Sequence, residues 1–220
     1  RLITDADWTV AGAFEWYGGS LRGVAGQGSL TAAGGSSFTG GANELDGGFT
    51  YRNALGATAL WTGTSQLTVV QGSTFENAGV LDMRVDQLVG TDGTSRFVNS
   101  GQIVKTAGSP TQWTTILGRV ENTGAWDIQA GRVRLGASPT STVTNSGALL
   151  GQPGTTWEVG GVLNSAGIID AGTFVFNGAS AQVTGSFAAD RTQVGSPVTM
   201  AGLVTQLGHL SIGGQLDVAA

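Results

Sequence analysis

Six charged residues have types and spacings that could act on a polysaccharide. They are Asp82, Arg84, Asp86, Asp127, Arg132 and Arg134. Alternate positions of a strand point to one side, so we expect these side chains to face outward. Paired carboxylates serve glycoside hydrolysis, and guanidinium groups or Ca²⁺ can neutralise the carboxylate of a uronic acid. The alternative is a solvated face on which the charges form weak ion pairs. We favour that alternative and assign no catalytic residue.

The residue inventory excludes several other chemistries. The chain has no Cys, which excludes disulfides and Cys-based metal sites. Its one histidine, His209, has no Ser or acidic residue at a spacing that suggests a Ser-His-Asp catalytic triad. We therefore expect His209 to be a surface residue. A net charge of −5 without a basic tract argues against nucleic acid. Asp46 and Asp92 stand in Gly-rich turns, where we expect them to stabilise the turn. Binding of Ca²⁺ is the alternative role, but a single carboxylate provides too few ligands for this ion. We therefore predict no metal and no cofactor.

Aromatic residues offer a second route to carbohydrate, because flat rings can pack on sugar rings. The candidates are Trp16, Tyr17, Trp61 and Trp113. Packing in a core or a turn is the commoner role of such residues, and we favour it for these four. Trp126 alternates with Asp127 and is expected to point inward.

A repeat must position all of these residues. An apolar residue, any residue, Asn, a small residue and Gly recur in this order, as in Val120-Glu-Asn122-Thr-Gly124. The repeated asparagines are Asn53, Asn77, Asn99, Asn122, Asn145 and Asn164. The matching glycines are Gly56, Gly79, Gly101, Gly124, Gly147 and Gly167. The first and last copies have one extra residue before Gly, which suggests a bulged turn.

The spacing of the repeat predicts the fold. Successive asparagines lie 24, 22, 23, 23 and 19 residues apart, a mean of about 22. Short alternating stretches separated by Gly, such as Trp126-Asp-Ile128 and Arg132-Val-Arg134-Leu135, indicate three strands per repeat. We predict an all-β protein, a right-handed single-stranded parallel β-helix of about ten coils.

The turn residues have separate expected roles. Gly adopts positive φ without steric cost. Stacked coils would place the Asn side chains above one another, where each amide can bond the next in a buried ladder. Arg52 and Glu76 precede two ladder asparagines on adjacent coils, which predicts a cross-coil ion pair.

We expect one solenoid domain over residues 1–220. Residues 1–50 form less regular N-terminal coils, 51–175 the regular Asn-x-Gly coils, and 176–220 less regular C-terminal coils. No stretch approaches about 18 uninterrupted apolar residues, so no membrane insertion is expected. The start, Arg1-Leu2-Ile3, lacks Met and an apolar signal region, which suggests a mature product or a segment of a longer protein.

The Asn-Ser/Thr/Ala-Gly turns, together with Trp61-Thr62-Gly63, resemble the repeats of bacterial β-strand-repeat surface and secreted proteins, of the filamentous-haemagglutinin-like and autotransporter-passenger-like kinds. The resemblance covers about Trp8 to Gly208. It implies an extracellular or cell-surface bacterial rod: an adhesin, a fibre or a matrix component. These proteins share no catalytic motif, so the resemblance assigns no active-site residue.

The sequence therefore predicts a non-enzymatic extracellular structural or adhesive module. We expect self-association or contact with neighbouring domains of a longer chain, with a glycan as a further partner and nucleic acid excluded. The alternative is a β-helix that binds or degrades polysaccharide, as a lyase or hydrolase. Enzymes of this shape build a groove from long loops, and coils of 22 to 24 residues leave little chain for them. For this reason we rank the enzyme second.

Overall fold

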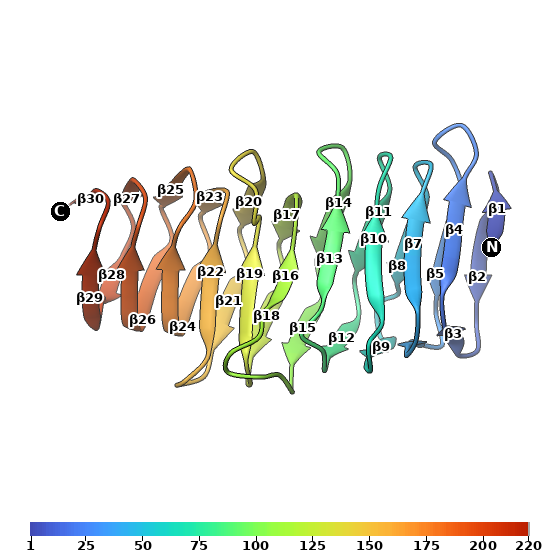
Figure 1. Ribbon diagram of the computed structural model, residues 1–220, viewed down its shortest axis with the longest axis horizontal. Helices are drawn as coiled ribbons and strands as arrows, with labels where there is room; N and C mark the ends of the chain where they lie inside the picture. The colour runs from blue at the N-terminus through green and yellow to red at the C-terminus, as the bar shows by residue number, and fades with distance from the viewer. Residues whose placement is uncertain (220) are drawn as a thin grey trace.

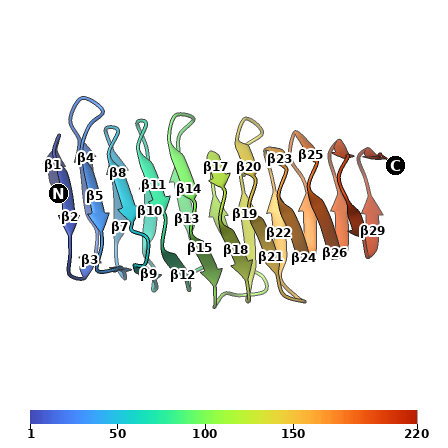
Figure 2. The ribbon, with the colours of Figure 1, turned by 180° about the vertical axis from the view of Figure 1, so that it is seen from behind.

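The computed structural model describes residues 1–219, and their regular structure is entirely β. Thirty short strands and no helix occur in that range. The chain winds as a parallel β-solenoid of about ten coils, with the two termini at opposite ends of the stack (Figure 1). The view from behind shows the coils following one another along the stack from the N-terminus to the C-terminus (Figure 2). The predicted all-β parallel solenoid, with coils of about 22 residues, is confirmed.

Each coil contributes one strand to each of three faces, which we call first, second and third in the order in which a coil reaches them. The first face contains β1 (Leu2–Thr4), β4 (Gly19–Gly23), β7 (Ala42–Asp46), β10 (Gln66–Val69), β13 (Leu88–Thr91), β16 (Thr114–Ile116), β19 (Arg132–Leu135), β22 (Thr156–Val159) and β29 (His209–Ile212). The second face contains β2 (Asp7–Val10), β5 (Ser29–Ala32), β8 (Thr50–Asn53), β11 (Thr74–Asn77), β14 (Arg96–Asn99), β17 (Arg119–Asn122), β20 (Thr142–Asn145), β23 (Val162–Ser165), β25 (Ser180–Val183), β27 (Val198–Met200) and β30 (Leu216–Val218).

The third face contains β3 (Phe14–Trp16), β6 (Ser36–Phe38), β9 (Thr58–Trp61), β12 (Val80–Met83), β15 (Gln102–Lys105), β18 (Ala125–Ile128), β21 (Ala148–Gly151) and β28 (Val204–Gln206). Two longer strands, β24 (Ile168–Phe176) and β26 (Ser186–Val194), run from the third face into the first without a turn between them. They join the first and third faces into one nineteen-stranded sheet.

Alternation along each strand builds the core. In β19, Val133 and Leu135 are fully buried, while Arg132 and Arg134 are only partly covered. Side chains of equal type stack on the coil below because the strands are in register. Phe75 stacks on Phe97 with ring centroids 5.0 Å apart, and such pairs add to the stability gained by burial.

The buried Asn ladder is confirmed for five of the six predicted residues. Asn53, Asn77, Asn99, Asn122 and Asn145 are register partners along the second face. Their amide groups bond from coil to coil at 2.7 to 2.8 Å. Each Nδ2 also donates to a backbone carbonyl of the next coil toward the C-terminus. The ladder therefore holds the backbone of successive turns together as well as their side chains.

The prediction that Asn164 is the sixth ladder residue is wrong. Asn164 is the register partner of Thr144 and is exposed, whereas Ser165 occupies the position above Asn145. The last repeat is therefore Ser165-Ala166-Gly167, with the usual spacing and no extra residue. An Asn one position early in the strand points to solvent because alternate residues face opposite sides.

The conformational explanation for the turn glycines is wrong for five of them. Only Gly56 has the expected positive φ, at +80°. Gly79, Gly101, Gly124, Gly147 and Gly167 lack it. At Gly124 a Cβ atom would overlap the carbonyl oxygen of Gly101 in the coil below. These glycines are required by the close approach of successive turns rather than by their own backbone angles.

The coils shorten toward the C-terminus. The buried position on the second face moves from Asn145 to Ser165, Val183 and Met200, so these coils have 20, 18 and 17 residues. The coils of 18 and 17 residues contain β24 and β26, which cross between faces without a turn. Near the middle of the stack, residues 106–113 form a longer loop between β15 and β16.

Candidate functional site

The six charged residues predicted as one patch are divided between two faces and the corner that joins them. Asp82 on β12 and Asp127 on β18 are both on the third face, with Val104 between them in register. Arg132 and Arg134 lie on β19 of the first face. Arg84 and Asp86 follow β12 in the corner between these faces. Among residues 1–219, no ion pair joins either arginine of β19 to Asp82, Asp86 or Asp127.

The carboxylates of the third face are engaged by their own neighbours. Arg84 Nη2 lies 2.7 Å from Asp82 Oδ2, and the Thr106 hydroxyl donates to Asp82 Oδ1 at 2.5 Å. Asp127 Oδ2 accepts a hydrogen bond from Gln129 Nε2 at 3.0 Å. The predicted pair between Arg52 and Glu76 is also present, at 2.9 Å. Such partners fit a solvated face with short-range ion pairs, each worth little to stability.

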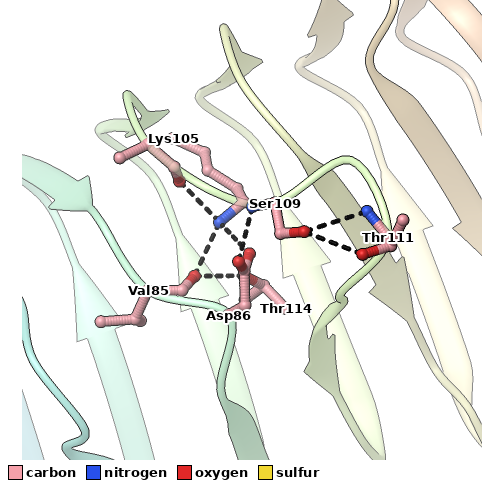
Figure 3. A network of polar contacts seen from close by, with 7 residues as sticks. Val85, Asp86, Lys105, Ser109, Thr111 and Thr114 are labelled. Atoms are coloured by element: carbon pink, nitrogen blue, oxygen red, sulfur yellow. Dashed lines mark hydrogen bonds and ion pairs between the residues drawn. The ribbon is translucent and has the colours of Figure 1, made fainter.

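Asp86 belongs to a buried network that sequence analysis missed (Figure 3). The Lys105 side chain has no exposed surface, and its ammonium group donates to Val85 O at 2.6 Å, Ala107 O at 2.8 Å and Asp86 Oδ1 at 3.0 Å. Asp86 Oδ2 in turn accepts from Ser109 N at 2.6 Å. The network fastens the loop of residues 106–113 to the corner that follows β12.

Lys105 has no access to a substrate. Burial lowers the pKa of Lys105, and the bond and charge of Asp86 oppose this effect. A lysine whose three donors are all used inside the protein is a structural group rather than a nucleophile. Two sequence signals point to it: Lys105 is the only Lys in the chain, and it alternates with the apolar Ile103, which places it inward.

Trp113, at the end of the same loop, is covered by two arginines. The Arg132 guanidinium lies 3.8 Å from the ring centroid and that of Arg134 lies 4.5 Å from it. Arg134 also pairs with Glu158, with Nε 2.8 Å from Oε1. A guanidinium over an indole ring is held by the charge distribution of the ring. Trp113 therefore holds two arginines of the first face.

The other aromatic candidates divide between core and surface. Trp16, Trp61 and Trp126 are buried, as predicted for core residues. Tyr17 is exposed and donates its hydroxyl to Glu15 Oε2 at 2.9 Å. Trp8, which was not singled out, is 52% exposed because its strand, β2, is the outermost strand of the second face among residues 1–219.

The turn carboxylates have structural partners. Asp46 is buried and lies 3.5 Å from Arg22 Nε. Asp92 Oδ1 accepts from Thr94 N and Ser95 N, and its Oδ2 accepts from Gln71 N of the preceding coil at 2.6 Å. Partial burial raises the pKa of Asp92, but these hydrogen bonds outweigh it and lower the pKa to about 2. His209 is exposed, as expected.

Two open depressions lie at the corners of the coils. One, of about 320 Å³, is lined by hydroxyl groups together with Asp92 and Arg119, at the corner between the first and second faces. The other, of about 370 Å³, is lined by Asp127, Asp170 and Asp190 at the corner between the third and first faces. Within residues 1–219, no group of three or more His, Cys, Asp or Glu side chains could hold a metal ion.

Comparisons of the chain with protein-family models, with curated proteins and with solved structures give no match. Across the part of the chain that the structure covers, no helix is long and apolar enough to cross a membrane.

Proposed function

We propose that the chain is a non-enzymatic structural module that stacks end to end with further copies, as a building block of a bacterial fibre, surface adhesin or matrix. The observation that carries this proposal is the apolar core surface that the first and last coils of residues 1–219 expose. The resemblance of the Asn-x-Gly repeats to those of bacterial surface proteins supports an extracellular or cell-surface location.

Among residues 1–219, the last coil presents core positions that no further strand covers. Ile212 is the register partner of Val194, and Leu210 of Thr192. Val194 is 1% exposed whereas Ile212 is 52% exposed. Val218 stands in the same way above the buried Met200. Covering apolar surface of this kind is the main favourable contribution to association.

The first coil of residues 1–219 also exposes apolar core positions. Trp8 is the register partner of Leu30. Trp8 is 52% exposed and Leu30 only 4%. Leu2, Val10 and Phe14 are partly buried and pack against the core from this end. Unpaired strand edges accompany this apolar surface, and such edges invite pairing with another chain.

Pairing of the last coil of one copy with the first coil of the next is head-to-tail, and such a contact builds an open filament. β29 would pair with β1 of the next copy, and β30 with β2. A joint between separate copies depends on their concentration, so we expect the assembly to dissociate on dilution.

The experiment is size-exclusion chromatography with light scattering over a range of concentrations, with negative-stain microscopy of the same fractions. We expect end-to-end oligomers that shorten on dilution. Ile212→Lys with Leu210→Lys should give a 22.2 kDa monomer. Leu55→Lys, in an exposed lateral turn, is the matched control and should assemble like the wild type. A wild type that is monomeric at every concentration would overturn the proposal.

The second candidate function is cleavage of a polysaccharide at the acidic depression of Asp127, Asp170 and Asp190, which includes one of the predicted residues. Pairs of carboxylates serve glycoside hydrolysis when they face each other across the bond that is cleaved. Uronate and neutral glycans should be assayed with the wild type, Asp127→Ala and Asp170→Ala. Activity of the wild type that either variant loses would place this function first.

A further inference from the structure

One row of outward side chains runs along the first face, from the middle of the rod to its C-terminal end. We call it the basic strip; it consists of Trp113, Arg132, Thr156, Thr173, Arg191 and His209. Register pairs link Arg132 to Thr156, Thr156 to Thr173, Thr173 to Arg191, and Arg191 to His209. Their strands, β19, β22, β24, β26 and β29, follow one another along the stack (Figure 1).

The strip holds two of the three arginines that form no ion pair among residues 1–219. Six of the nine arginines form ion pairs with Asp or Glu. Among residues 1–219 the remaining three are Arg1, Arg132 and Arg191, and the last two both belong to the strip. Acidic residues outnumber basic residues in this chain of net charge −5, and yet these two arginines have no acidic partner.

Arg132 is also held in place. Its guanidinium lies over the Trp113 ring, and Arg134 lies over the same ring at 4.5 Å. Glu158 pairs with Arg134, so one positive charge near the ring has no carboxylate partner. A guanidinium fixed on an aromatic ring loses little conformational freedom when it binds an anion. Asp190, next to Arg191 in the chain, accepts a hydrogen bond from Gln206 at 3.1 Å instead of pairing with Arg191.

We propose that the basic strip binds an anionic polysaccharide, one that carries uronate or sulfate groups, laid along the axis of the rod. Arginine recognises carboxylate and sulfate oxygens through paired N–H groups, and the threonines between the two arginines offer hydroxyl groups to a sugar chain. Arg132 and Arg191 are three coils apart, about 14 Å at the spacing of neighbouring strands. A single small anion cannot span that distance, whereas a polymer with repeated charges can.

The chemistry favours a glycan over single-stranded nucleic acid. Binding of bases without sequence preference uses exposed aromatic rings as stacking platforms. The one aromatic residue of the strip, Trp113, is already covered by arginine. The strip lies on the side of the rod and not at its ends, so this proposal does not depend on the end-to-end assembly proposed above.

The test measures binding of the intact chain to polygalacturonate and to dextran sulfate by isothermal titration calorimetry, with neutral dextran and oligo-dT as comparisons. We expect binding to at least one of the two anionic polysaccharides that weakens as salt is raised, none to neutral dextran, and weaker binding to oligo-dT. Arg132→Gln with Arg191→Gln should lower the affinity by about tenfold or more, which corresponds to the loss of about 1.4 kcal/mol.

The matched control is Arg52→Gln with Arg96→Gln, which removes the same charge from the second face and should change the affinity less than about threefold. Arg191→Gln alone, at an exposed position, keeps the test valid if the double variant does not fold. Three results would each overturn the proposal: no binding of either polyanion at low salt, an equal loss in the control, or tighter binding of oligo-dT than of both polysaccharides.

Discussion

Asn145 donates a hydrogen bond from its Nδ2 to Ser165 Oγ, 3.0 Å away, and at this bond the buried ladder passes from amides to a hydroxyl group. Every ladder amide donates toward the C-terminus, and every one except Asn53 accepts from the N-terminal side. Above Ser165 the position is filled by Val183. Below Asn53 it is filled by Ala32, and Asn53 Oδ1 has no donor among residues 1–219. The ladder thus has a direction and two ends.

An interior amide of the ladder has two partners to lose. We predict that Asn122→Ala lowers the free energy of unfolding by about 1–3 kcal/mol, because Asn99 Nδ2 loses an acceptor and Asn145 Oδ1 loses a donor inside the protein. Urea unfolding followed by circular dichroism measures the change. Asn164→Ala is the matched control, since this side chain is exposed, and it should stay within about 0.5 kcal/mol of the wild type. Equal effects of the two substitutions would contradict the ladder.

The N-terminal end of the ladder can be extended. Ala32 is fully buried and is the register partner of Asn53. We predict that Ala32→Ser raises the free energy of unfolding by about 1 kcal/mol, because its hydroxyl can donate to Asn53 Oδ1. The same substitution with Asn53→Ala should give no gain, which separates the new hydrogen bond from any general effect of serine. A gain in both backgrounds would show that the bond is not its cause.

The period of the sequence was enough to predict the fold, because the Asn-x-Gly spacing and the alternation of apolar residues both follow from stacking. It was not enough to fix the register in every coil. Asn164 was included by its residue type, although its neighbours Leu163 and Ser165 are the buried residues of β23. The apolar pattern decides which residues face inward, and it identifies Ser165 instead.

The candidate sites were less predictable than the fold. Arg132, Arg134 and Trp113 were each singled out, but their contact depends on a loop of residues 106–113 that folds back onto the next coil. The partner of Asp86 was missed because a lysine is usually a surface residue. Its inward position was visible in the alternation of β15, and the carbonyl groups of Val85 and Ala107 together with the Asp86 carboxylate satisfy its buried ammonium group.

The close approach of the turns predicts a strong effect at Gly124. We expect Gly124→Ala to destabilise the protein by at least about 2 kcal/mol, because the new Cβ overlaps the Gly101 carbonyl oxygen and forces two coils apart. Gly93→Ala is the control, since a Cβ there meets nothing within 4 Å and its φ is not in the left-handed region. Thermal unfolding of the two variants measures the difference, and similar melting temperatures would refute the packing explanation.

The Lys105 network predicts coupling between two residues. Lys105→Met should cost about 3 kcal/mol, because Asp86 is left without its cation in a mostly buried corner. Adding Asp86→Asn should recover about 1 kcal/mol or more, which urea unfolding of the single and double variants measures. Arg84→Met breaks the exposed pair with Asp82 and should cost less than about 1 kcal/mol. Strict additivity of the two corner substitutions would show that the pair is not a unit.

The Asp92 carboxylate should make the free energy of unfolding decrease in acid. Its pKa is about 2 in the folded protein and near 3.8 when unfolded, so the unfolded chain binds the proton more readily. The carboxylate therefore contributes stability that is complete above pH 3.8 and is lost as the pH falls through about 2. Asp92→Asn should melt below the wild type at neutral pH, and the gap should close across this window. Asp5→Asn, at an exposed position, should follow the wild-type curve. Parallel curves for Asp92→Asn and the wild type down to pH 2 would mean that its hydrogen bonds do not favour the charged form.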